Sequence, residues 1–169
     1  MKIFTLHTVQ NLPITVDEAW NFLSDPKNLK TITPEYMSFD ILAGADRPMY
    51  PGQLIQYNVT PIAGISTKWV TEITHVKEKE YFVDEQRFGP YALWHHKHFI
   101  TPIPGGVKME DIVDYKLPFG KLGELFHPLL VAPKLKEIFK YRKVKLEALF
   151  GIYSSVKTME ASIQENSFN

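Results

Sequence analysis

The sequence predicts an α+β fold in which a curved antiparallel sheet of about seven strands packs against one long C-terminal helix. A length of 169 residues, with 44% hydrophobic and 22% charged residues, fits a single globular domain with a sizeable core. The middle of the chain shows the two-residue period of half-buried strands without intervening helices, which favours antiparallel pairing. Residues 133–150 instead show the period of an amphipathic helix.

The N-terminal part predicts one strand followed by two short helices. Residues 2–12 form the expected strand, which Pro13 ends. Thr15 and Glu18 have the spacing of a capping box, in which each side chain bonds the backbone amide of the other residue, so a short helix should follow. Residues 27–32 predict a second short helix, because Pro26 suits the first position of a helix.

Six further strands are expected in the middle of the chain, over residues 37–42, 53–61, 65–76, 81–88, 91–103 and 107–117. Turn-forming residues separate them. Ala63 and Gly64 predict one turn, and Pro104, Gly105 and Gly106 form the clearest hairpin signal in the sequence. The segment as a whole therefore predicts a run of antiparallel strands.

The last third of the chain predicts the helix that covers this sheet. Pro128 and Pro133 disfavour a regular helix before residue 133, because proline lacks the amide hydrogen and clashes with the preceding turn. Beyond them one stripe holds Leu135, Ile138, Phe139, Arg142, Leu146, Leu149 and Phe150, and Gly151 is expected to end the helix. We therefore expect one domain over residues 1–151 and a polar tail over residues 152–169.

The composition argues against several classes of function. Lys+Arg and Asp+Glu both number 19, and a formal net charge of zero disfavours general binding to nucleic acids or to anionic membranes. The absence of cysteine excludes disulfides, thiol catalysis and cysteine-based metal sites. No apolar run reaches the length of a membrane span, and the first residues lack the hydrophobic block of a signal peptide. We expect a cytoplasmic protein, and we assign no oligomeric state.

The hairpin around Gly105 allows the inner face of the sheet to be predicted. A loop of two or four residues pairs even positions of the incoming strand with odd positions of the outgoing one. One face then carries Trp94, His96, His98, Ile100, Val107, Met109, Asp111, Val113, Tyr115 and Leu117. The other face holds most of the charged residues, so the first face should be the buried one.

Three polar side chains, His96, His98 and Asp111, thus lie on an otherwise apolar face. Burying an ionisable group without a partner costs several kcal/mol. The register puts Asp111 opposite either His98 or Ile100, and we expect a hydrogen bond between His98 and Asp111. Such a pair can serve a ligand, or it can be an internal polar contact without chemistry.

Three segments carry a resemblance to a known superfamily. They are residues 89–98 (GPYALWHHKH), residues 109–120 (MEDIVDYKLPFG) and residues 135–142 (LKEIFKYR). The chain resembles a bacterial ligand-binding branch of the START-like superfamily, also called SRPBCC, which includes birch-pollen-allergen-like proteins and polyketide cyclases. The resemblance implies the helix-grip fold, in which the sheet wraps around the C-terminal helix. It implies a ligand cavity between them but leaves the ligand open.

The first functional hypothesis is a binding protein for a small, mostly apolar molecule, lipid-, quinone- or polyketide-like. We expect its cavity to be lined by Tyr57, Trp69, Trp94, His96, His98, Met109, Asp111, Val113, Tyr115, Phe139 and Arg142. The alternative is a cyclase/aromatase- or dehydratase-type enzyme. In it His98, polarised by Asp111, would act as a general base in the same cavity.

A metal site is a third hypothesis. His96 and His98 lie on one face of a strand and, with Asp111, match the residue types of a two-histidine, one-carboxylate site. A cupin-type motif would add a carboxylate a few residues after the second histidine, and residues 99–103 contain none. We therefore assign no metal and no cofactor from the sequence.

Overall fold

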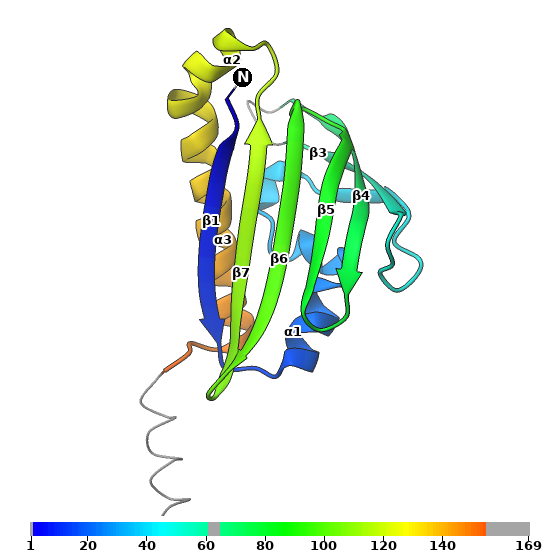
Figure 1. Cartoon of the computed structure of the whole chain (residues 1–169), viewed down its shortest axis with the longest axis vertical. Coiled ribbons are helices and arrows are strands. Elements are labelled where there is room, and N and C mark those ends of the chain that lie inside the picture. Colours follow the sequence, from blue (N-terminus) through cyan, green and yellow to red (C-terminus); the bar gives the residue numbers. More distant parts are fainter. Residues whose placement is uncertain (1, 61–64, 155–169) are drawn as a thin grey trace, which may run out of the picture.

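The computed structural model describes residues 2–60 and 65–154. Its strands are β1 (Phe4–Leu12), β2 (Asp40–Ala43), β3 (Gln53–Val59), β4 (Thr67–Lys77), β5 (Tyr81–Phe88), β6 (Leu93–Ile103) and β7 (Gly106–Lys116). They form one antiparallel sheet in the order β1-β7-β6-β5-β4-β3-β2 (Figure 1). The first strand therefore lies at one edge of the sheet, beside the last strand. The predicted seven-stranded antiparallel sheet is confirmed.

Short helices follow β1, as predicted. The α-helix α1 (Val16–Leu23) begins at the expected capping box, with the Thr15 hydroxyl accepting from the Glu18 amide and the Glu18 carboxylate accepting from the Thr15 amide. The second short helix is a 3-10 helix, η1 (Pro26–Lys30). A further 3-10 helix, η2 (Glu35–Met37), occupies the start of the segment predicted as strand 37–42, so β2 begins only at Asp40.

The C-terminal helical segment is divided into three parts. They are α2 (Lys121–Phe126), a π-helical turn η3 (His127–Val131) and α3 (Ala132–Phe150). The π turn contains Pro128, in agreement with the expected interruption of the regular helix. The chain leaves α3 at Gly151, as predicted, with a φ of 94° that favours glycine. Among the described residues, no helix combines the length and hydrophobicity that crossing a membrane requires.

The β6–β7 hairpin has the predicted register. Pro104 and Gly105 form a two-residue turn between Ile103 and Gly106, and His98 lies opposite Asp111. Inward and outward residues alternate along all of β7, and the inner set contains Met109, Asp111, Val113 and Tyr115. The parity argument from the sequence therefore gave the correct inner face.

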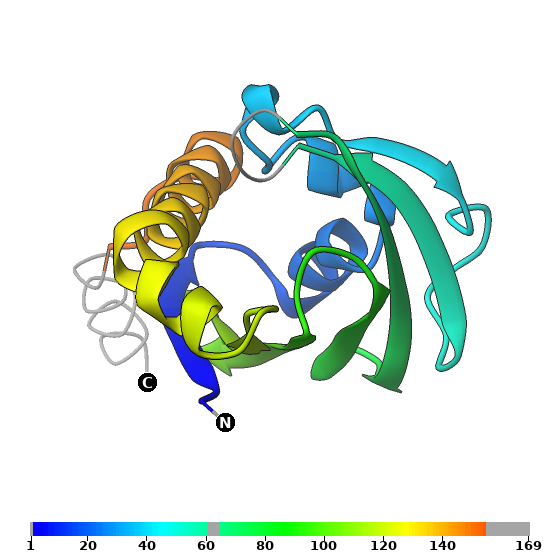
Figure 2. The same cartoon turned by 90° about the horizontal axis from the view of Figure 1, so that it is seen from above.

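The sheet curves around an interior that α3 closes from one side (Figure 2). Two groups of buried side chains form the core. One group joins α1 and the residues of β6 and β7 nearest their hairpin to Leu146 of α3. The other joins Val113 and Tyr115 of β7 to Leu135 and Phe139 of α3. One residue of the predicted helix stripe was placed wrongly. Leu149, in the last turn of α3, is 48% exposed, whereas its neighbour Phe150 packs against the core.

Two predictions fall outside the described residues. These are the turn at Ala63 and Gly64 and residues 155–169, which make up most of the expected polar tail.

Candidate functional site

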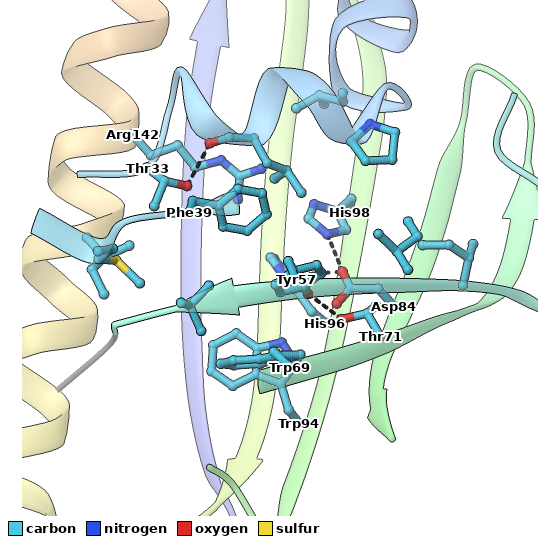
Figure 3. A pocket seen from close by; sticks show the side chains of 18 of the residues that line it. Thr33, Phe39, Tyr57, Trp69, Thr71, Asp84, Trp94, His96, His98 and Arg142 are labelled. Carbon is cyan, nitrogen blue, oxygen red and sulfur yellow. Dashed lines mark hydrogen bonds and ion pairs between the residues drawn. The ribbon is translucent and has the colours of Figure 1, made fainter. Parts of the chain in front are cut away.

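A cavity of about 170 Å³ lies between the inner face of the sheet and α3 (Figure 3). Most of its wall is apolar or aromatic. Trp69 and Trp94 meet edge to face with ring centroids 5.4 Å apart, and Tyr57 stacks on Trp69. Burial and the charge of Asp84 raise the pKa of Tyr57, whose hydroxyl contacts that of Thr71, so this phenol stays protonated in the folded protein.

Four ionisable side chains reach this wall from three elements. Asp84 of β5 lies directly across the sheet from His96 of β6, and His98 follows two residues later on the same face. Arg142 enters from the middle of α3, where a charged residue interrupts the apolar stripe. All four line the cavity.

The two histidines lie between two carboxylates. Nε2 of His98 is 2.8 Å from Oδ2 of Asp84, and Nδ1 of His96 is 3.6 Å from the same oxygen. On the other side, Oδ1 of Asp111 is 3.0 Å from Nε2 of His96 and 2.8 Å from Nδ1 of His98. The imidazole ring centroids are 3.7 Å apart. Each imidazole therefore faces Asp84 through one nitrogen and Asp111 through the other.

Arg142 completes this buried cluster. Its Nη1 lies 3.5 Å from Oδ1 of Asp111, and the side chain of Arg142 is only 10% exposed. Burial alone would raise the pKa of Asp111, but the charge of Arg142, the hydrogen bond from His96 and the close contact with His98 hold it well below the ordinary value. Burial likewise opposes ionisation of Asp84, yet contacts with His98 and His96 lower its pKa. Both carboxylates are therefore ionised at neutral pH.

The two imidazoles have opposite pKa shifts. Burial lowers the pKa of His96, and the neighbouring His98 adds to that effect. Burial also disfavours the charged form of His98, but its contacts with Asp111 and Asp84 outweigh burial and raise its pKa. The geometry thus favours a neutral His96 beside a more basic His98.

The expected contact between His98 and Asp111 is present, at 2.8 Å, although the His98 Nδ1 atom lacks the angle of a hydrogen bond. Asp84 was not predicted as a partner of the two histidines. Its signal was the alternation in β5, which puts Asp84 on the same face as Phe82. Asp84 could not be assigned to His96 and His98 from the sequence, because the register between β5 and β6 must first be known.

The structure brings seven of the eleven predicted site residues to the cavity, and these are Tyr57, Trp69, Trp94, His96, His98, Phe139 and Arg142. Met109 and Asp111 instead line a second hollow of about 410 Å³ between β1 and α3, with Phe139 and Arg142 lining both spaces. Val113 and Tyr115 line neither, because they pack into the core against Leu135.

The comparisons with known proteins define the fold class. No protein-family model matches the sequence, and no curated protein matches it either. Solved structures, in contrast, match over most of the chain, and they show that this protein has the helix-grip fold.

Three of these structures show how wide the likeness is. A protein from Chromobacterium violaceum has a TM-score of 0.69 and 13% identity, over 88% of this chain and 99% of that one. Protein Ms6760 from Mycobacterium smegmatis has a TM-score of 0.62 and 19% identity, over 86% and 89%. The major latex-like protein 151 of Panax ginseng has a TM-score of 0.65 and 13% identity, over 88% and 97%. At these identities the likeness concerns the fold.

Proposed function

We propose that this protein is an intracellular binding protein for a small, mostly apolar molecule that carries one polar or anionic group. The molecule lies in the cavity between the sheet and α3. Its apolar part packs against the aromatic wall of Tyr57, Trp69 and Trp94, and its polar group points toward His96 and Arg142. This combination of an apolar wall with a few convergent polar groups is the usual composition of a small-molecule site.

The observation that supports this proposal most directly is the cavity itself. Protein interiors are close-packed, so an empty space lined by more than a dozen apolar side chains and four ionisable ones lowers the stability of the fold. A ligand that fills this space would restore the lost packing contacts. Its volume of about 170 Å³ is below the roughly 300 Å³ expected of a small-molecule site. The proposal therefore commits to a compact ligand. A longer one would need the Phe139 side chain, which lines both spaces, to turn aside.

The enzyme hypothesis finds less support in the geometry. A general base needs a free nitrogen within hydrogen-bond reach of the substrate proton. Both ring nitrogens of His98 already lie 2.8 Å from carboxylate oxygens. Catalysis by the pair of His98 and Asp111 stays a prediction that only a substrate can test.

Binding is tested with the untagged chain in two steps. Native mass spectrometry of the protein purified under mild conditions should show an added mass of a few hundred daltons. Isothermal titration with 2-naphthol, a compact aromatic alcohol, should show one binding site per chain. A wild-type protein that neither carries such a mass nor binds 2-naphthol would contradict the proposal.

Two substitutions on β4 test on which face of the sheet 2-naphthol binds. Ile73 lines the cavity, whereas Val70, three residues earlier, points to the outer face. Ile73→Phe should weaken 2-naphthol binding by about tenfold, since overpacking a filled site costs about 1–3 kcal/mol and about 1.4 kcal/mol corresponds to tenfold. Val70→Phe adds the same ring outside the cavity and should leave binding unchanged. Equal effects of both substitutions would place the probe elsewhere.

A further inference from the structure

Three ligand atoms of metal-binding type converge at one end of the polar cluster. They come from Asp84, His96 and His98, and one ligand atom of each residue lies within 4.8 Å of the other two. Oδ2 of Asp84 contacts both Nδ1 of His96 and Nε2 of His98. The residues come from adjacent strands, so the backbone of the sheet fixes their positions. Figure 3 shows the three side chains turned toward one another at the cavity wall.

Their spacing suits a tetrahedral ion. With bonds of about 2.0–2.2 Å to nitrogen and oxygen, two ligand atoms of a tetrahedral zinc site lie about 3.4 Å apart. The two distances to Oδ2 of Asp84 are 2.8 Å from His98 and 3.6 Å from His96. Shifts of about a few tenths of an ångström in the ends of these side chains would bring both distances to the value of a tetrahedral site.

The opposite sides of both imidazoles are also arranged as in metal sites. A metal-bound histidine almost always donates its second ring N–H to a carboxylate or carbonyl, which fixes the tautomer and the ring orientation. Here Oδ1 of Asp111 is hydrogen-bonded to Nε2 of His96 at 3.0 Å, and it lies 2.8 Å from Nδ1 of His98, where a small turn of the ring would complete the second hydrogen bond. Arg142 in turn contacts Asp111. The site thus has three inner ligands and a supporting outer carboxylate.

We propose that Asp84, His96 and His98 bind one divalent transition-metal ion of the Zn²⁺ type, with Asp111 orienting both histidines from outside. Two imidazoles and one carboxylate form a ligand set that suits zinc and its neighbours in the first transition row. The fourth position faces the cavity, because all three ligands line it. A metal with three protein ligands and one open position can bind an oxygen of a small molecule directly.

This proposal replaces the assignment of no metal made from the sequence. That assignment sought the third ligand in β6 or at Asp111, and the third ligand comes from β5. The charge balance supports the change. Asp84 and Asp111 bring two negative charges into the cluster, and Arg142 compensates one of them. The remaining negative charge attracts a cation into the cluster.

The test uses the untagged full-length chain after treatment with a chelator. Zn²⁺ is titrated in competition with a chromogenic chelator, and one Zn²⁺ per chain in the micromolar range or tighter is expected. Co²⁺ should give the visible absorption of a tetrahedral site. A wild-type chain that binds no stoichiometric Zn²⁺ overturns the proposal, whatever the variants do.

Matched variants separate the ligands from other histidines. Asp111→Asn should weaken Zn²⁺ binding about 10- to 100-fold, as is typical when a partner outside the inner ligands is changed. Asp84→Asn and His98→Gln each remove an inner ligand and should weaken Zn²⁺ binding by more than this. His95 lies on the outer face of β6 against Glu85, so His95→Gln is the control and should bind as the wild type does. Equal losses in His95→Gln and His98→Gln would overturn the proposal.

The metal proposal can fail separately from the proposed function. The 2-naphthol titration on the chelator-treated wild type measures the cavity without any metal. Binding of 2-naphthol without stoichiometric Zn²⁺ would reject the metal site alone. Zn²⁺ binding by a protein that neither carries an added mass nor binds 2-naphthol would reject the apolar-ligand proposal alone. Circular dichroism of each variant shows whether a loss of binding reflects unfolding.

Discussion

Replacing Asp111 with asparagine should strongly destabilise the metal-free protein. Oδ1 of Asp111 contacts His96, His98 and Arg142, and its side chain is only 12% exposed. Asparagine keeps the shape but removes the charge, which leaves the buried guanidinium of Arg142 without its nearest partner. Breaking a buried ion pair in this way costs about 3–5 kcal/mol. The lower part of this range applies, because Asp84 stays within the cluster and compensates part of the positive charge.

A loss of about 3 kcal/mol lowers the Tm of a domain of this size by about 6–12 °C, since about 1 kcal/mol corresponds to about 2–4 °C. The assay is thermal unfolding followed by circular dichroism at pH 6. The matched control is Asp114→Asn. Asp114 lies on the same strand but on the outer face, where its 28% exposed side chain pairs with Lys97. Partly exposed pairs contribute about 0–1 kcal/mol, so its Tm should fall by less than about 4 °C. Equal shifts for the two substitutions would refute the assigned role of the buried cluster.

Two further predictions concern pH and helix packing. The folded-state pKa of Asp111 is below the unfolded value of about 3.9, so its stabilisation is present above that pH and is lost as pH falls through the folded pKa. The Tm difference between the wild type and Asp111→Asn should therefore be largest near pH 6 and shrink below about pH 3; a difference that grows in acid would contradict this sign. In urea unfolding, Leu146→Ala should cost about 2–5 kcal/mol, because Leu146 is 2% exposed, and Leu149→Ala about 0.5 kcal/mol or less at 48% exposure. Similar costs for both would show that α3 presents a different face to the sheet.

Local signals in the sequence were sufficient for most of the secondary structure and for the inner face of the last hairpin. The capping box at Thr15 and Glu18 set the start of α1, because both hydrogen bonds form between residues three apart. The two-residue turn at Gly105 set the register of β6 and β7, and with it the pairing of His98 and Asp111. These features depend on residues close in sequence or joined by a tight turn.

Features that depend on distant elements were predicted less well. Leu149 follows the same helical period as Leu146, yet only the packing of α3 on the rest of the fold decides that one is exposed and the other buried. Val113 and Tyr115 are on the predicted face, but Leu135 of α3 fills the space before them, so they form core instead of cavity wall. Periodicity gives the direction of a side chain and not what occupies the space in front of it.

The sequence by itself determined that this chain forms a curved antiparallel sheet with a long helix across it, and that His96, His98 and Asp111 are buried there. Tertiary structure alone decided that Asp84 of β5 joins them and that the expected Arg142 of α3 contacts Asp111. The reason is that the side chains of one strand are placed by alternation, whereas contacts between β5, β7 and α3 depend on strand order and on where the helix crosses the sheet. The chemistry of this site therefore appears only when the sheet is assembled.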